Sequence, residues 1–182
     1  IRVGVVGAAG RMGATVCAAV AADSALQLVA AIDTTGDVTA QGVPISRELK
    51  ALAENQAEVV VDFTVAAAAR VTLPWLALHG VHAVVGTTGF SDAQKAEIAA
   101  IAKDIAIVMA PNMSVGVNVT LKLLEMAATA LSTGYDIEII EAHHRHKVDA
   151  PSGTALKMGE VIAGALGRDE DRRAIPGSQS GG

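Results

Sequence analysis

The chain has 182 residues, of which 51% are hydrophobic, 18% are charged and only 2% are aromatic. This apolar content excludes a disordered chain, and the length suits one domain or one and a half. A net charge of −5, scattered basic residues and only four aromatic side chains argue against a nucleic-acid-binding surface. The mean hydropathy is +0.42. We nevertheless expect no membrane span, because Pro74, Gly80, His82 and Gly86 interrupt the uncharged stretch 71–90.

Cysteine usage bears on the compartment of the protein. Cys17 is the only cysteine, so an internal disulfide is excluded and a reducing compartment is favoured. We expect Cys17 to be a small apolar residue on a helix. No signal peptide is expected, because the first apolar strand already begins at residue 2. These features predict a cytoplasmic protein.

Short runs rich in Val and Ile alternate with Ala-rich segments of helical periodicity in the first part of the chain. Strands are expected at residues 2–6, 27–32, 58–62, 82–86 and 106–109. Helices are expected at residues 12–22, 65–78 and 92–103, with a loop at 34–43. Alternation of this kind predicts an α/β fold with a doubly wound parallel sheet of the Rossmann type.

Two of these helices carry specific local signals. Ser91 and Gln94 have the spacing of a capping box at the start of helix 92–103. Pro74 lies inside the segment 65–78, where it is expected to kink the helix or restart it near Thr72.

The pattern changes after Pro111, and a domain boundary is expected there. A helix is expected at residues 115–131, a strand at 136–141 and a last helix at 154–166. We therefore expect two domains, at 1–113 and 114–182. Because a single strand cannot form a sheet, the second should be an incomplete α+β domain, and its charged and Gly/Ser-rich tail 168–182 should be disordered.

A glycine-rich segment at residues 7–13, with the sequence GAAGRMG, follows the first strand and opens the first helix. Gly7 permits a tight turn, Gly10 lets backbone N–H groups approach a pyrophosphate, and Gly13 lets the helix pack closely. The spacing is a variant of the usual dinucleotide fingerprint, and its position supports that interpretation. The alternative is a glycine-rich turn that binds nothing.

Asp33 ends the second strand, where an acidic residue usually binds the adenosine ribose hydroxyls and repels a 2′-phosphate. The following residues, Thr34 to Gly36, supply no cation for such a phosphate. NADH is therefore favoured, with Arg11 as the only nearby cation that could support use of NADPH. The alternative is an ordinary aspartate in a surface turn.

Small polar residues also follow three later strands, in the segments 62–64, 86–89 and 110–113. In open α/β sheets the ligand lies beyond the carboxyl ends of the strands, so these segments are expected to line the nicotinamide side. Each segment taken alone is also compatible with an ordinary turn.

Residues 141–155, with the sequence EAHHRHKVDAPSGTA, contain three of the five histidines together with Arg145 and Lys147. Ser152 and Gly153 then open a helix, whose free N–H groups suit a carboxylate. Cations beside a helix N-terminus predict a site for a small, multiply anionic substrate, and histidine can transfer protons near neutral pH.

Three other interpretations of this basic loop stay open. Zinc binding by His143, His144 and His146 is disfavoured, because adjacent side chains on an extended chain point in different directions and no cysteine lies nearby. We expect no metal site. A purely solvated basic loop is the second interpretation, and binding of a phosphate instead of a carboxylate is the third.

Together the segments 7–13, 61–64, 85–90 and 141–155 resemble the 4-hydroxy-tetrahydrodipicolinate reductase family, also called dihydrodipicolinate reductase, over residues 1 to about 167. The resemblance implies reduction of a cyclic dicarboxylate, 4-hydroxy-tetrahydrodipicolinate, to tetrahydrodipicolinate with NADH or NADPH in diaminopimelate and lysine biosynthesis. It also implies a homotetramer that assembles through the second domain.

The resemblance assigns roles to individual residues. His143 corresponds to the family's proton donor and acceptor, and Lys147 corresponds to its proton donor. His144, Gly153 and Thr154 correspond to substrate-binding positions. The implied cofactor-binding positions are Gly7, Ala8, Ala9, Gly10, Arg11, Met12, Asp33, Gly86, Thr87, Thr88, Ala110, Pro111, Asn112 and Met113.

This chain departs from the family pattern at two positions. Met113 stands where many relatives carry an aromatic residue, and it fills a similar volume. Thr34 stands where some relatives carry arginine, which weakens the case for NADPH.

Two alternative functions remain open at the level of sequence. One is a non-catalytic NAD-binding domain or a truncated, inert fragment, and the proton-donating loop argues against a non-catalytic domain. The other is a nucleotide-linked reductase of another small dicarboxylate.

Overall fold

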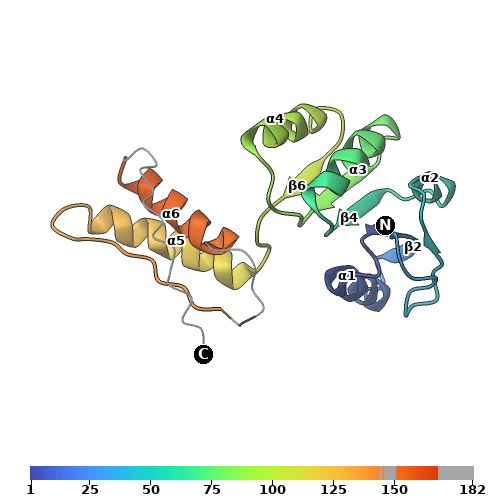
Figure 1. The fold of residues 1–182 in the computed structure, drawn as a ribbon, viewed down its shortest axis with the longest axis horizontal. Helices are drawn as coiled ribbons and strands as arrows, with labels where there is room; N and C mark the ends of the chain where they lie inside the picture. The colour runs from blue at the N-terminus through green and yellow to red at the C-terminus, as the bar shows by residue number, and fades with distance from the viewer. Residues whose placement is uncertain (144, 146–150, 168–182) are drawn as a thin grey trace. The chain divides into compact units, whose positions relative to one another are not determined.

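The computed structural model describes residues 1–143, 145 and 151–167. It divides the chain into two compact units, Ile1–Ala110 and Pro111–Gly182 (Figure 1).

The first unit contains a six-stranded sheet and four helices. Its strands are β1 (Arg2–Val6), β2 (Gln27–Ile32), β3 (Ile45–Ser46), β4 (Val59–Asp62), β5 (His82–Val85) and β6 (Ile107–Met109). Its helices are α1 (Arg11–Ala22), α2 (Lys50–Glu54), α3 (Ala66–Leu78) and α4 (Asp92–Ile101).

All strand pairs in this sheet are parallel, in the order β3-β2-β1-β4-β5-β6. The chain therefore winds in one direction from β1 and in the other from β4, which confirms the doubly wound fold. Asp62 at the end of β4 pairs with Val6 of β1 and with Val85 of β5. The turns after these three strands consequently lie side by side at the switch point, where open α/β sheets bind their ligands.

Alternate side chains of the strands enter two apolar clusters. Val3 and Val5 of β1 pack against α1, whereas Val6 packs on the other face with residues of α2, α3 and α4. Figure 1 shows α1 and these three helices on opposite sides of the sheet. Burial on both faces explains why the strands are continuous runs of Val, Ile and Ala instead of alternating apolar and polar residues.

Sequence periodicity located five of the six strands to within a residue at either end, but it missed β3 and α2. β3 has only two residues and α2 has five, so neither is long enough to show a periodic pattern. The segment 34–43 is a loop, as expected, closed by an isolated bridge between Val38 and Pro44.

The expected restart of helix 65–78 near Thr72 is wrong, because α3 runs without interruption from Ala66 to Leu78 with Pro74 inside it. Proline cannot donate the usual backbone hydrogen bond. Leu73 and Leu76, on either side of it in the helix, are fully buried. Their packing holds the helix together despite the missing bond.

The capping box is confirmed. The Ser91 side chain accepts a hydrogen bond from the Gln94 N–H at 3.3 Å, and the Gln94 side chain accepts one from the Ser91 N–H at 2.8 Å. These bonds satisfy two donors that the start of α4 would otherwise leave open.

The second unit is built around two helices that pack against each other, α5 (Val115–Ala130) and α6 (Gly153–Ala165). Both match the expected helices closely. The strand expected at residues 136–141 is wrong, since the described part of this unit contains no strand there. This segment has no neighbouring strand with which to form a ladder among the described residues. The tail 168–182 lies outside the described residues.

No helix in the described part of the chain is both long enough and apolar enough to cross a bilayer.

Candidate active site

The turn after β1 presents backbone N–H groups at the start of α1. Gly7 has a positive φ of 80°, and its N–H and that of Ala8 donate to the Ile32 carbonyl at 2.8 and 3.1 Å. Gly10 is the N-cap residue and supplies no capping side chain. The first N–H groups of α1 are thus left open to an anion, as a dinucleotide pyrophosphate would require.

Two glycines give this turn its shape. A Cβ on Gly13 would overlap the carbonyl oxygen of Gly7, so only glycine allows α1 to approach the turn this closely. A Cβ on Gly10 would lie 3.2 Å from the same oxygen, in the space in front of the helix N-terminus. The structure therefore provides a cradle that a side chain would fill, which fits a bound pyrophosphate.

Asp33 lies directly beside this turn. Its Oδ2 accepts the Ala9 N–H at 2.9 Å, and its Oδ1 accepts the Thr35 N–H at 3.1 Å. Partial burial raises the pKa of Asp33. These two hydrogen bonds, with others from Thr34 and Thr35, have the opposite and larger effect, so the pKa of Asp33 is below its usual value. An ionised carboxylate next to the phosphate turn fits the binding of ribose hydroxyls.

Asp62 links the turns after β4 and β5. Its side chain is fully buried, and Oδ1 accepts three hydrogen bonds, from the Thr64 N–H at 2.8 Å, the Thr64 hydroxyl at 2.6 Å and the Thr87 hydroxyl at 3.1 Å. The Phe63 ring packs onto Gly86 so closely that a Cβ there would overlap it. Thr87, a sequence-predicted cofactor position, therefore points its hydroxyl inward, and Thr88 follows it in the same turn.

Ala110 to Met113 span the boundary between the two units. The Ala110 N–H donates to the Val85 carbonyl at 3.4 Å, which holds Ala110 beside the end of β5. Within the second unit, the Asn112 side chain accepts the Ser114 N–H at 2.9 Å, just before the start of α5.

In the second unit, Glu141 brings His143 and the start of α6 together. Glu141 Oε2 lies 2.8 Å from His143 Nε2, and Glu141 Oε1 accepts the Ser152 N–H at 2.8 Å. Hydrogen bonds from Ser152, and then from His143, lower the pKa of Glu141 to about 2. An ionised carboxylate can only accept hydrogen bonds, so His143 donates from Nε2, and Nδ1 is the atom of the neutral ring that accepts a proton.

The same contacts define which N–H groups of α6 are free. The Ser152 hydroxyl accepts the Ala155 N–H at 3.1 Å, and the Ser152 N–H is bound to Glu141. The N–H groups of Gly153 and Thr154 have no acceptor within the described part of the chain. These are the two positions at which a substrate carboxylate was expected.

Several expected site residues cannot be placed. His144, His146 and Lys147 lie outside the described residues. Arg145 is described and exposed. Among the described residues no group of three His, Cys, Asp or Glu side chains could hold a metal ion.

Sequence reasoning missed the contributions of Glu141 and Asp62 to the site. Both residues stood in segments that the motifs singled out, but their partners lie 11 and 25 residues away along the chain, at Ser152 and Thr87. The available signal was an acidic residue at the end of a buried strand for Asp62, and an acidic residue opening a basic loop for Glu141.

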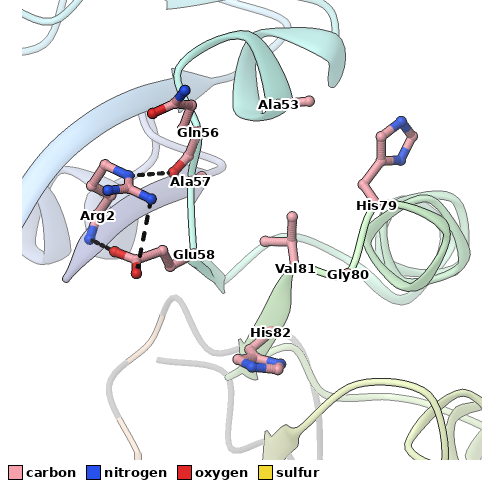
Figure 2. Close-up of a pocket in the computed structure, with 9 residues that line it drawn as sticks. All are labelled: Arg2, Ala53, Gln56, Ala57, Glu58, His79, Gly80, Val81 and His82. Atoms are coloured by element: carbon pink, nitrogen blue, oxygen red, sulfur yellow. Dashed lines mark hydrogen bonds and ion pairs between the residues drawn. The ribbon is translucent and has the colours of Figure 1, made fainter.

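A cavity of about 590 Å³ lies at the other end of the strands, where β1, β4 and β5 begin. Figure 2 shows Arg2 in this cavity bound to the Gln56 carbonyl and to Glu58, with His79 and His82 on the other side. Arg2 Nε donates to the Gln56 carbonyl at 2.6 Å, and the backbone N–H of Arg2 donates to Glu58 Oε2 at 2.7 Å. None of the sequence-predicted site residues lines this cavity.

The sheet, its glycine turn and the acidic residue after β2 define a dinucleotide-binding protein of the Rossmann class. Comparison with known proteins identifies the family. Residues 1–113 match the family described as "Dihydrodipicolinate reductase, N-terminus", and residues 116–180 match "Dihydrodipicolinate reductase, C-terminus". The chain belongs to the dihydrodipicolinate reductase family.

Individual relatives agree. The chain is 51% identical to a 4-hydroxy-tetrahydrodipicolinate reductase of Burkholderia cenocepacia, with 97% of this chain and 71% of the relative covered. It is 48% identical to that of Thiobacillus denitrificans, over 98% of this chain and 71% of the relative. The chain is accordingly an NAD(P)H-dependent oxidoreductase.

Solved structures also match. A dipicolinate-bound dihydrodipicolinate reductase from Paenisporosarcina sp. TG-14 superimposes with a TM-score of 0.77 at 30% identity, over 98% of this chain and 71% of that one. GenD2 from gentamicin A biosynthesis, in complex with NAD, matches 73% of this chain and 39% of its own with a TM-score of 0.54 at 22% identity, which supports the fold alone.

Proposed function

We propose that this chain reduces 4-hydroxy-tetrahydrodipicolinate to tetrahydrodipicolinate with NADH or NADPH, with the 4-hydroxyl group leaving as water, as a step in diaminopimelate and lysine biosynthesis. The observation that carries the proposal is that Glu141 holds His143 next to the two free N–H groups that open α6. A proton-transferring ring beside an anion-binding helix N-terminus suits a substrate that has carboxylates and takes up a proton on reduction.

The cofactor is held by residues of the first unit. The N–H groups at the start of α1 and the turn from Gly7 to Met12 bind the pyrophosphate, and Asp33 binds the adenosine ribose. Gly86 to Thr88 and the segment from Ala110 to Met113 lie on the nicotinamide side. The bound cofactor supplies the hydride. NADH is preferred, because ionised Asp33 would repel a 2′-phosphate and Thr34 offers no cation to offset this.

The proton and the substrate carboxylates are handled by the second unit. His143 exchanges a proton at Nδ1, because its Nε2 is bound to Glu141. The N–H groups of Gly153 and Thr154 bind a substrate carboxylate. Family resemblance assigns proton donation to Lys147 and substrate binding to His144, and the positive charge of Lys147 would stabilise the developing anion.

The proposal extends to the assembly and the compartment. We assign a homotetramer that assembles through the second unit, which exposes several large apolar side chains on α5. We assign the enzyme to the cytoplasm, since its single cysteine, Cys17, is buried and free and needs no oxidising environment.

The test is steady-state kinetics with saturating NADH and substrate that is generated enzymatically. Wild type should oxidise NADH only when substrate is present. Lys147→Ala and His143→Gln should lower kcat by about 10²–10⁴-fold, the usual contribution of general acid catalysis. His144→Ala should mainly raise KM for the substrate.

Two results would contradict this scheme. A wild-type chain that binds NADH without any turnover would be a non-catalytic binding domain. A Lys147→Ala variant with near-normal kcat and only a raised KM would show that Lys147 holds a carboxylate and does not donate the proton.

A further inference from the structure

The turn after β4 lies between the two turns that were assigned to the cofactor. β4 pairs with β1 on one side and with β5 on the other, and Asp62 is in register with the last residue of each. Residues 63 and 64 therefore follow between the phosphate turn and the segment from Gly86 to Thr88. Any displacement of this middle turn would move its neighbours.

Polar contacts join the middle turn to the turn after β5. The Asp62 carbonyl accepts the Gly86 N–H at 2.9 Å, and Asp62 Oδ1 accepts the Thr87 hydroxyl at 3.1 Å. The same Oδ1 binds both the N–H and the hydroxyl of Thr64. One buried carboxylate oxygen thus fixes the positions of two turns.

Apolar contacts join the middle turn to both neighbours. The Phe63 ring occupies the space where Gly86 would carry a Cβ. The Thr64 methyl group lies 2.9 Å from the corresponding position on Gly7, whose φ of +80° already favours glycine. The middle turn therefore packs closely against the turns on both sides.

The surroundings of the Asp62 side chain indicate a role beyond packing. Its Oδ2 is buried and has no hydrogen-bond partner among the described residues. Burial of an unpartnered carboxylate oxygen is unfavourable, and native proteins seldom keep one without a reason. Three hydrogen bonds converge on the other oxygen, Oδ1, which anchors Thr64 and Thr87.

We propose that Asp62 is a positioning residue for the nicotinamide end of the cofactor. It holds the Thr87 hydroxyl inward, so that the backbone of Gly86 to Thr88, and not the Thr87 side chain, faces the nicotinamide. Thr87 is 4% exposed, and its hydroxyl is bound to Asp62. This role rests on the proposed cofactor site.

The test compares two ligands by calorimetric titration. NADH contacts the whole site, whereas ADP-ribose lacks the nicotinamide and reports only on the phosphate turn and Asp33. Thr87→Val removes the hydroxyl that Asp62 holds and keeps the shape of the side chain. It should raise Kd for NADH by about tenfold or more, as expected for a misplaced binding group, and leave Kd for ADP-ribose unchanged.

Three further variants separate positioning from stability. Thr87→Ser keeps the hydroxyl and should restore NADH affinity. Asp62→Asn keeps one oxygen acceptor but replaces the second oxygen with an amide group, and it should weaken NADH binding selectively. Thr72→Val is the matched control, because Thr72 is also buried and its hydroxyl binds the Ala68 carbonyl within α3, away from these turns. It should lower the unfolding temperature without changing either Kd.

The outcomes distinguish the positioning role of Asp62 from the proposed cofactor site on which it rests. Unchanged NADH affinity in folded Thr87→Val would overturn the positioning role and leave the proposed cofactor site standing. Equal weakening of NADH and ADP-ribose would also overturn the positioning role, because the effect would not be confined to the nicotinamide end. Failure of the wild type to bind either NADH or NADPH would overturn both proposals. If Asp62→Asn does not fold, the comparison of Thr87→Val with Thr87→Ser decides the question.

Discussion

Gly10 and Gly13 belong to one turn but meet different constraints. Gly10 has φ −70° and ψ 162°, a conformation open to any residue, and an added Cβ would be 3.2 Å from the Gly7 oxygen. At Gly13 the Cβ would overlap that oxygen. Glycine at position 10 therefore keeps space free for a ligand, whereas glycine at position 13 permits the fold.

This difference gives a paired prediction. Gly10→Val should raise Kd for NADH by at least about 100-fold, or ~2.7 kcal/mol, while the unfolding temperature stays close to that of wild type. Gly13→Ala should lower the unfolding temperature markedly. Titration calorimetry and thermal unfolding of both variants measure these effects. Unchanged NADH affinity in Gly10→Val would mean that the segment is only a turn.

We expect the preference between NADH and NADPH to depend on Asp33 and its neighbour Thr34. Thr34→Arg should shift the preference toward NADPH by about tenfold, ~1.4 kcal/mol, because a guanidinium can pair with the 2′-phosphate that Asp33 repels. The ratio of Kd values for NADPH and NADH measures the shift. Thr133→Arg, at an exposed threonine outside the first unit, adds the same charge and should leave the ratio unchanged. A clear tenfold preference of wild type for NADPH would contradict the assignment.

At the scale of elements, local sequence predicted those that are long or repetitive. Val-rich runs predicted β1, β2, β4, β5 and β6, and the Ser91–Gln94 spacing predicted the start of α4. The two-residue β3 leaves no such pattern, because it is defined by its pairing with β2. Residues 136–141 have the composition of a strand, but a strand also needs a partner, which composition does not reveal.

The site divides in the same way. The cofactor-binding roles of Gly7, Gly10 and Asp33 are predictions that local sequence permits, because both glycines lie in the turn between β1 and α1 and Asp33 follows the next strand, β2. The hydrogen bond from Thr87 to Asp62 could not be predicted, because it requires knowing that β5 lies beside β4. The contact of Glu141 with Ser152 likewise depends on how the loop between them returns to α6.

Glu141 joins an irregular segment to the start of α6, and its low pKa makes that link sensitive to pH. Because the pKa falls from 4.5 to about 2 on folding, the ionised form stabilises the folded state. This contribution is fully present above about pH 4.5 and is lost as the pH falls through about 2. Glu141→Gln lacks it at every pH.

Wild type should therefore unfold at a higher temperature than Glu141→Gln at neutral pH, and the difference should shrink below about pH 4.5. Thermal unfolding of both proteins across this range measures it. Lys122 and Glu125 form an exposed ion pair on α5, so Glu125→Gln is a control that should alter stability little at neutral pH. A constant difference between wild type and Glu141→Gln across the whole range would contradict the assigned contact.

At the scale of the whole molecule, the two units differ in how well they cover their apolar residues. The first unit buries two clusters on the faces of its sheet. On α5 of the second unit, large apolar side chains three or four residues apart remain exposed and form one stripe, comprising Val115, Val119, Leu123 and Met126. A contiguous exposed apolar surface of this kind is typical of a surface that is covered in the functional assembly.

Assembly as a homotetramer predicts two linked measurements. Sedimentation velocity should give a species of four times the 18.4-kDa chain mass. Since assembly stabilises only folded protein, the unfolding temperature should also fall as the protein is diluted toward dissociation. Added salt should not dissociate the species if apolar burial holds it together, whereas an interface of exposed ion pairs would weaken. A single 18.4-kDa species with a melting temperature independent of concentration would contradict the assembly.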